Sequence, residues 1–100
     1  MKFLIVGEQQ APIPVEMGAD LYRAAIEWFN GGFAAGTVEC HYVFADMGGF
    51  AIMNAESHEA VFDTLLSYPL FPFFEWEVKA LCDWDHTYAS LIQYFENVAG

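Results

Sequence analysis

The sequence predicts an α+β domain of βαββαβ order, the ferredoxin-like arrangement with an antiparallel sheet, followed by an extra C-terminal helix. Apolar and polar residues alternate over 38–46 and 73–82, which is typical of edge strands with one covered face. Nearly continuous apolar runs over 2–6 and 50–53 are typical of strands covered on both faces. Because the first and third strands are central in a ferredoxin-like sheet, the two patterns fit that order.

The length of the chain predicts one domain over residues 1–100, and its charge argues against two kinds of partner. One hundred residues, 56% of them hydrophobic, can bury one core but not two. A formal net charge of −11 with three strong cations leaves no basic surface for nucleic acid or an anionic membrane. No apolar run reaches the ~20 residues of a membrane-spanning helix. We therefore expect neither nucleic acid nor membrane as a partner.

The cysteines favour a cytoplasmic location. Cys40 and Cys82 lie far apart, form no CxxC motif and follow no secretory signal. Reduced thiols in strand patterns are the simplest interpretation.

The first third of the chain predicts a central strand followed by a long helix. The run over 2–6 forms the strand, and two prolines make 8–16 a loop. Apolar residues then recur at helical spacing over 17–30. Glycines commonly follow a helix end, so Gly31 and Gly32 should end this one.

The middle of the chain predicts a hairpin and a second helix. The edge strand 38–46 and the central strand 50–53 are joined by the tight turn Met47-Gly48-Gly49. Ser57 is a suitable N-cap for the helix that follows, and Pro69 closes that helix.

The last third predicts the fourth strand over 73–82 and a short C-terminal helix. Behind Asp85, apolar residues recur at helical spacing. They are Tyr88, Leu91, Ile92 and Phe95. The apolar face of this helix needs a surface to cover.

The sheet face without helices would still carry apolar side chains. They come from the two central strands and from Val43 and Ala45 of the edge strand 38–46. An apolar surface of that size usually forms an interface. We therefore expect a homodimer, or a higher homo-oligomer, in which two sheets pack face to face as a dimeric α/β barrel.

Residues 57–82 resemble the C-terminal half of muconolactone δ-isomerase, a dimeric α/β barrel family. Three motifs carry the resemblance: Ser57-x-Glu59-Ala60-x-x-Asp63-Thr64-Leu65, Pro69-Leu70-Phe71-Pro72 and Glu77-Val78-x-x-Leu81-Cys82. The resemblance implies the family fold and, as an activity, isomerisation without a cofactor.

The chain departs from this family where a lactone carrying carboxylates would bind. The family has a lysine in the first strand and arginines around the second, whereas 3–8 and 38–42 contain no cation. A family histidine falls on Phe62, and His58 replaces an apolar residue one turn earlier. The expected ligand is therefore a small, largely apolar carbonyl compound.

Shifting a double bond next to a carbonyl needs a base for the α-proton and a donor for the enolate oxygen, but no obligatory metal or organic cofactor. Glu39 and His41 are two residues apart on one strand, so we expect them to share a face and act as such a pair. The alternative is that both lie at a solvated edge or in the subunit interface.

His58, in the first turn of its helix, could act as a neutral donor, because the helix dipole disfavours its protonated form. It could equally cap or pack. Tyr22 and Tyr42 could donate to an oxyanion if they face a pocket, and otherwise belong to the core.

No other motif indicates a cofactor or a metal. Asp83-Trp84-Asp85-His86 has metal-ligand residue types but no second cluster at a suitable spacing. Gly48-Gly49 joins two strands and so is no phosphate loop, and no serine or cysteine nucleophile motif is present.

Three functions remain open from sequence. The first is a cofactor-free isomerase acting on a small apolar carbonyl compound. The second is a non-catalytic module for ligand binding or oligomerisation, which the aromatic content and the extra helix favour. The third is a cofactor-free monooxygenase, which rests on fold analogy alone.

Overall fold

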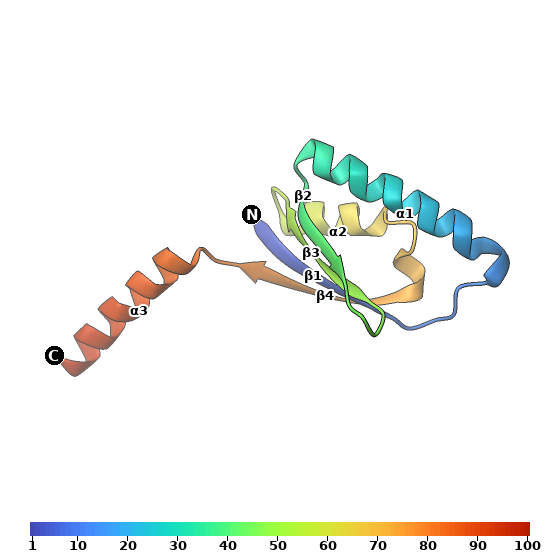
Figure 1. Cartoon of the computed structure of the whole chain (residues 1–100). Helices are drawn as coiled ribbons and strands as arrows, with labels where there is room; N and C mark the ends of the chain where they lie inside the picture. The colour runs from blue at the N-terminus through green and yellow to red at the C-terminus, as the bar shows by residue number, and fades with distance from the viewer.

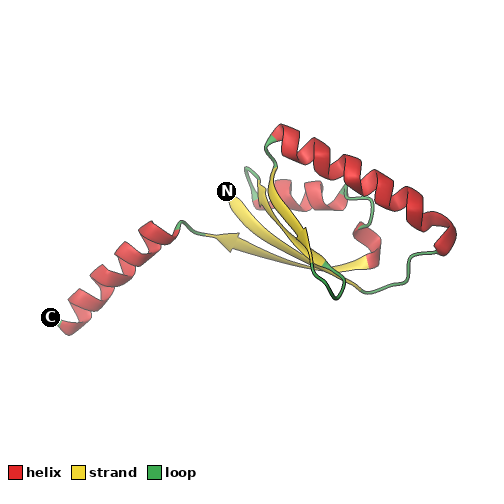
Figure 2. Ribbon diagram, viewed as in Figure 1, coloured by secondary structure: helices red, strands yellow, loops and turns green.

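The computed structural model describes residues 1–100 as a four-stranded antiparallel sheet with two helices on one face and a third helix projecting away from it (Figure 1). Figure 2 shows the two layers from the same side. The elements are β1 (Lys2–Gln9), α1 (Val15–Ala35), β2 (Val38–Val43), β3 (Gly49–Asn54), α2 (His58–Leu66), a 3-10 turn (Phe71–Phe73), β4 (Phe74–Leu81) and α3 (Trp84–Ala99).

The strand order β2-β3-β1-β4 is the ferredoxin-like order and confirms that β1 and β3 are central. Side chains alternate between two environments along β1, as the pleat requires. Phe3 and Ile5 are buried beneath the helices, whereas Leu4 and Val6 point to the face without helices. The core is one cluster: Phe3, Ile5, Val38, Ala51, Met53, Val61 and Leu65.

The predicted end of α1 at Gly31 and Gly32 is wrong, because the helix continues to Ala35. It ends at Gly36, whose φ of 78° is in the left-handed region that favours glycine. Gly32 lies within the helix because of packing: a Cβ there would be 2.6 Å from Cγ2 of the buried Val38. Gly32 therefore lets the last turn of α1 approach β2 closely.

The hairpin of β2 and β3 is present, but β2 contains a bulge that its sequence pattern did not indicate. Val38 is opposite Met53 and Cys40 is opposite Ile52, so two residues of β2 advance while β3 advances by one. From Cys40 onward, each side chain of β2 therefore points to the opposite face of the sheet from the one that simple alternation would give it. β2 also ends at Val43, because the Phe44 backbone N–H donates to the Gly48 carbonyl and closes the turn.

α2 begins at the predicted cap. The Ser57 hydroxyl accepts a hydrogen bond of 3.0 Å from the backbone N–H of Ala60. After the helix, the chain turns at the segment that contains Pro69 and enters the 3-10 turn before β4. The Trp28 indole donates to the Ser67 hydroxyl at 3.0 Å and joins α1 to the end of α2.

α3 is longer than expected and projects away from the two layers (Figure 1). It follows β4 after a two-residue link, and its apolar residues are exposed (Figure 1). With α3 extended, the molecule measures 65 × 28 × 23 Å. No helix combines the length and apolar character that crossing a membrane would require.

The sheet face opposite α1 and α2 is called the open face here. It carries Leu4, Val6, Phe50 and Ile52, whose side chains are half-buried by their neighbours on the sheet. The packing of this face on a second sheet stays a prediction.

The close approach at Gly32 gives a matched test. Gly31→Ala should stabilise the protein by about 0.5–1 kcal/mol, because Gly31 is in the helix and nothing lies within 4 Å of its would-be Cβ. Gly32→Ala has the same helix-propensity gain but must displace Val38, so it should be net destabilising by up to about 2 kcal/mol. Urea unfolding measures both. Equal effects of the two substitutions would contradict the close approach.

Candidate functional site

A cavity of about 390 Å³ lies between α1, α2 and the helix-covered face of the sheet. Of the 21 residues that line it, 16 are hydrophobic, and none is Lys, Arg, Asp or Glu. This size is within the range of small-molecule sites, which are concave and largely apolar with a few placed polar groups. The polar side chains to consider are therefore Tyr22, Asn30, His41 and Tyr68.

The cavity has an aromatic wall whose position depends on a glycine. The Trp76 ring of β4 lies over Gly7 of β1, where a Cβ would be 2.7 Å from the ring atom Cζ3. The Trp76 indole N–H donates to the Phe71 carbonyl at 3.1 Å, and the Tyr68 ring meets Trp76 edge-on at 5.8 Å. This wall offers ring faces and edges, which suit a flat apolar ligand.

His41 enters the cavity because of the bulge in β2. Its partner in the ladder is the buried Ala51, which places His41 on the helix-covered face. The ring stacks on Phe29 with 3.8 Å between centroids and an 8° interplanar angle. Nδ1 is 3.0 Å from the Phe50 carbonyl oxygen, and only an N–H can bond to that acceptor. In the neutral ring Nε2 is therefore the unprotonated nitrogen and has the basic lone pair.

Tyr22 of α1 and Tyr68, in the turn after α2, supply two phenols to the cavity lining. Burial, together with the charge of a nearby Tyr22, raises the pKa of the Tyr68 phenol from 10.0 to about 12. Tyr68 is therefore a neutral hydroxyl at physiological pH and can donate a hydrogen bond. Tyr22 lines the cavity, which is one of the two alternatives that the sequence left open. Tyr68 was not among the candidate residues proposed from sequence.

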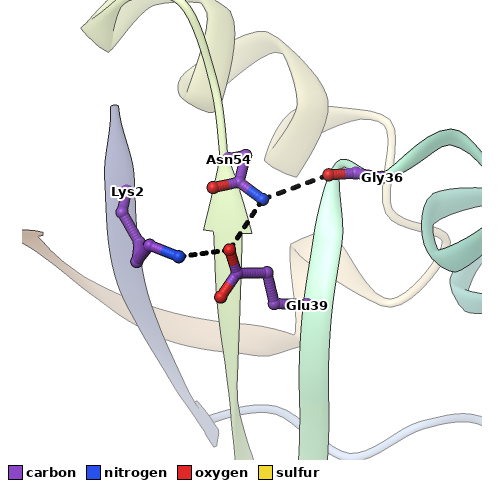
Figure 3. A network of polar contacts seen from close by, with 4 residues as sticks. All are labelled: Lys2, Gly36, Glu39 and Asn54. Atoms are coloured by element: carbon purple, nitrogen blue, oxygen red, sulfur yellow. Dashed lines mark hydrogen bonds and ion pairs between the residues drawn. The ribbon is translucent and has the colours of Figure 1, made fainter.

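Glu39 and His41 do not share a face, so the predicted pairing is wrong. Glu39 lies on the open face, where Lys2 forms an ion pair with it and the Asn54 amide donates to it at 3.1 Å (Figure 3). Asn54 also donates to the Gly36 carbonyl at 3.1 Å. The hydrogen bonds from Lys2 and Asn54 hold the pKa of the Glu39 carboxyl below its ordinary value. The bulge is the cause, because alternation places residues i and i+2 together only in an unbroken strand.

His58 and Tyr42 lie outside the cavity. His58 begins α2 with its ring edge-on to Phe3 at 5.7 Å, and it is exposed. Tyr42 is opposite Phe50 on the open face, stacks on that ring at 5.9 Å and is 65% exposed. Neither residue lines the cavity that contains His41. Their catalytic roles stay predictions.

The residues of the Asp83–His86 segment serve the start of α3. Asp83 precedes the helix, and the Thr87 hydroxyl donates to its carbonyl at 2.9 Å. The Asp85 carboxylate accepts from the backbone N–H of His86 at 2.8 Å. The structure brings no three His, Cys, Asp or Glu side chains together in a geometry suited to a metal ion.

Solved structures identify the fold. Muconolactone isomerase superposes with a TM-score of 0.75 at 24% identity, covering 83% of this chain and 90% of that one. The chain has the muconolactone isomerase fold. A 5-chloro-2-hydroxyhydroquinone dehydrochlorinase from Burkholderia phenoliruptrix, solved in complex with 2,5-dihydroxybenzoquinone, has a TM-score of 0.68 at 22% identity, covering 86% and 98%. The resemblance to muconolactone isomerase in residues 57–82 is thus confirmed at the level of fold.

Comparison by sequence adds no relative to these structures. No protein-family model matches the chain, and no curated protein matches it. At identities below a quarter, similarity of structure defines the fold and leaves the reaction to be argued from the cavity of this chain.

The raised pKa of Tyr68 predicts a late step in the alkaline titration of the five tyrosines. Tyrosinate absorbance should show one phenol ionising near pH 12, and Tyr68→Phe should remove that step. Because the folded pKa exceeds the ordinary value of 10.0, the associated stabilisation is complete below pH 10 and is lost as the pH rises through 12.

The control for this titration is Tyr94→Phe, since Tyr94 is an exposed residue of α3. Near-ultraviolet circular dichroism recorded in parallel identifies the pH at which the fold is lost. A late step that persists in Tyr68→Phe while the protein is folded would contradict the assignment.

Proposed function

We propose that this chain is a muconolactone isomerase-like protein that binds a small neutral carbonyl compound in its cavity and shifts a double bond without a cofactor. The observation that carries the proposal is the position of His41. Its ring lines an apolar cavity, its tautomer is set by the Phe50 carbonyl, and Nε2 has no hydrogen-bond partner within the chain.

His41 is the proposed base. Nε2 takes the acidic proton next to the carbonyl, the electrons of that C–H bond move into the enolate, and the negative charge collects on the carbonyl oxygen. Return of the same proton from the imidazolium to the far end of the conjugated system completes the shift. The stack on Phe29 and the hydrogen bond to the Phe50 carbonyl hold the plane of the His41 ring in place during this cycle.

The two phenols are the proposed oxyanion donors. Tyr68 has a raised pKa and therefore keeps its proton while it donates to the enolate oxygen. Tyr22 lines the same cavity and approaches closely enough to affect that pKa. Donors of this kind stabilise charge that develops during the reaction more than they stabilise the neutral ligand.

The lining of the cavity favours a neutral, flat ligand. A carboxylate would lose its hydration there without meeting a cation, which costs several kcal/mol. The net charge of −11 further disfavours an anionic ligand. The complex of the dehydrochlorinase with a dihydroxybenzoquinone supports a six-membered carbonyl ring as the class to test first.

The same proposal includes assembly and location. The open face is apolar at its centre and would pack on a second copy as a dimeric α/β barrel. Cys40 and Cys82 are free thiols, which supports a cytoplasmic location.

A second candidate is ligand binding without turnover. It is favoured by the small number of polar groups in a cavity whose lining is mostly hydrophobic. Both candidates require the same ligand class, and they differ in whether His41 moves a proton.

The decisive experiment follows proton exchange. Neutral cyclic β,γ-enones are incubated with the protein in deuterated water, and NMR detects binding and deuterium uptake next to the carbonyl. The protein should accelerate the uptake, and His41→Asn should reduce the acceleration by about 10²- to 10⁴-fold, because it removes the base. Tyr68→Phe should reduce it by up to about 10²-fold.

Tyr94→Phe is the matched control for the tyrosine substitution and should behave as wild type, because Tyr94 is remote from the cavity. Binding without uptake in the wild type would favour the second candidate. Uptake that His41→Asn leaves unchanged would remove His41 from the mechanism.

A further inference from the structure

The observed register of β2 is not the one that its own apolar pattern favours. With simple alternation, Cys40 and Tyr42 would share the helix-covered face with the buried Val38. In the structure they are opposite Ile52 and Phe50, which belong to the open face. Contacts outside the apolar pattern must therefore stabilise the bulge.

The length of the turn between β2 and β3 does not select the register. Val43 is opposite Gly49, so the five residues 44–48 form the loop. A register without the bulge, called the slipped register here, would place Val43 opposite Gly48 and leave the four residues 44–47. Hairpin loops of both lengths are common. The slipped register is therefore a real competitor, and in it His41 would lie on the open face.

Asn54 holds the start of β2 at three points. Its backbone N–H donates to the Thr37 carbonyl at 2.9 Å. Its side-chain amide donates to the Gly36 carbonyl and to the Glu39 carboxylate, each at 3.1 Å (Figure 3). Lys2, which is opposite Asn54 in the ladder, forms an ion pair with the same carboxylate. Since Glu39 is the extra residue of the bulge, both central strands bind that residue from the open face.

These contacts act against the slipped register in two ways. The bonds to Thr37 and Gly36 fix the start of β2, so the extra residue cannot move back toward α1. In the slipped register Glu39 would take the place that Cys40 has now, a displacement of about 3.8 Å between consecutive Cα atoms. A hydrogen bond of 3.1 Å does not tolerate a displacement of that size. The network in Figure 3 therefore stabilises the bulge.

We propose that Asn54 and Lys2 are positioning residues, which hold Glu39 in the bulge and thereby direct His41 into the cavity. Neither lines the cavity, so both act through the backbone of β2. The consequence for proton transfer rests on the proposed function, in which His41 is the base, whereas the position of its ring does not. The side chains of Lys2 and Glu39 are 40% and 41% exposed, and ion pairs at such sites contribute little by themselves. Asn54 is therefore the residue to test.

The first test compares Asn54→Asp with Asn97→Asp by NMR of the full chain without ligand. Asn54→Asp removes the side-chain donor and places a carboxylate beside Glu39, whereas Asn97→Asp makes the same change on the exposed side of α3. In the wild type, the ring protons of His41 should be shifted upfield and show Overhauser contacts with Phe29. Asn54→Asp should reduce both signals by roughly half or more, because a hydrogen bond is lost and two carboxylates repel. Asn97→Asp should change neither.

Deletion of Glu39 provides a rescue that a merely structural role would not predict. Without the extra residue, simple alternation after Val38 places Cys40 on the open face and His41 in the cavity. Asn54→Asp in this background should therefore keep the full stack. Equal weakening of the stack in both backgrounds would overturn the proposal, as would a stack that Asn54→Asp leaves intact when Glu39 is present.

The deletion background also covers the case in which Asn54→Asp prevents folding of the chain that retains Glu39. A folded protein with a stacked His41 in the deletion background would then support the proposal. An unfolded protein in both backgrounds would overturn it.

Deuterium uptake by a neutral cyclic β,γ-enone separates this inference from the proposed function. Asn54→Asp should reduce the acceleration of uptake in the same proportion as the stack of His41, and deletion of Glu39 should restore it. Unchanged uptake with a lost stack would contradict His41 as the base while supporting its positioning by Asn54. Reduced uptake with an intact stack would overturn the positioning role.

Discussion

The extra residue in β2 determines which side chains can meet in this protein. Without it, Val38 and Cys40 would point beneath the helices while Glu39 and His41 would both point to the open face. With it, Glu39 is placed beside Lys2 and Asn54 while His41 reaches the cavity. One backbone irregularity thus separates a charged network from a histidine that stacks on an aromatic ring. The chemistry proposed for the cavity depends on this exchange of faces.

The order of the elements could be predicted because it depends on local patterns. The double-sided apolar runs identified the two central strands, and Ser57 identified the start of α2. The end of α1 could not be predicted in the same way, because a glycine can mark a helix end or a close contact. Gly32 has the second role, and only the position of Val38 reveals it.

The candidate site was harder to predict, because it depends on contacts between residues distant in the sequence. Tyr22 could be proposed from sequence, but the direction of Tyr68 depends on how the segment after α2 turns toward Trp76. His41 was selected for its proximity to Glu39, and the bulge that removes this pairing leaves no pattern in the sequence. The presence of a histidine within a strand therefore helped to identify the site, whereas the expected pairing of that histidine with Glu39 did not.

The distribution of charge connects the cavity with the surfaces of the chain. All 14 acidic residues lie outside the cavity lining, and two of the three strong cations, Lys2 and Lys79, are on strands beside acidic partners. A ligand that needed a cation would have to displace one of these ion pairs and cross an acidic surface. A neutral ligand meets neither cost, and its recognition can depend on ring contacts and the phenols alone.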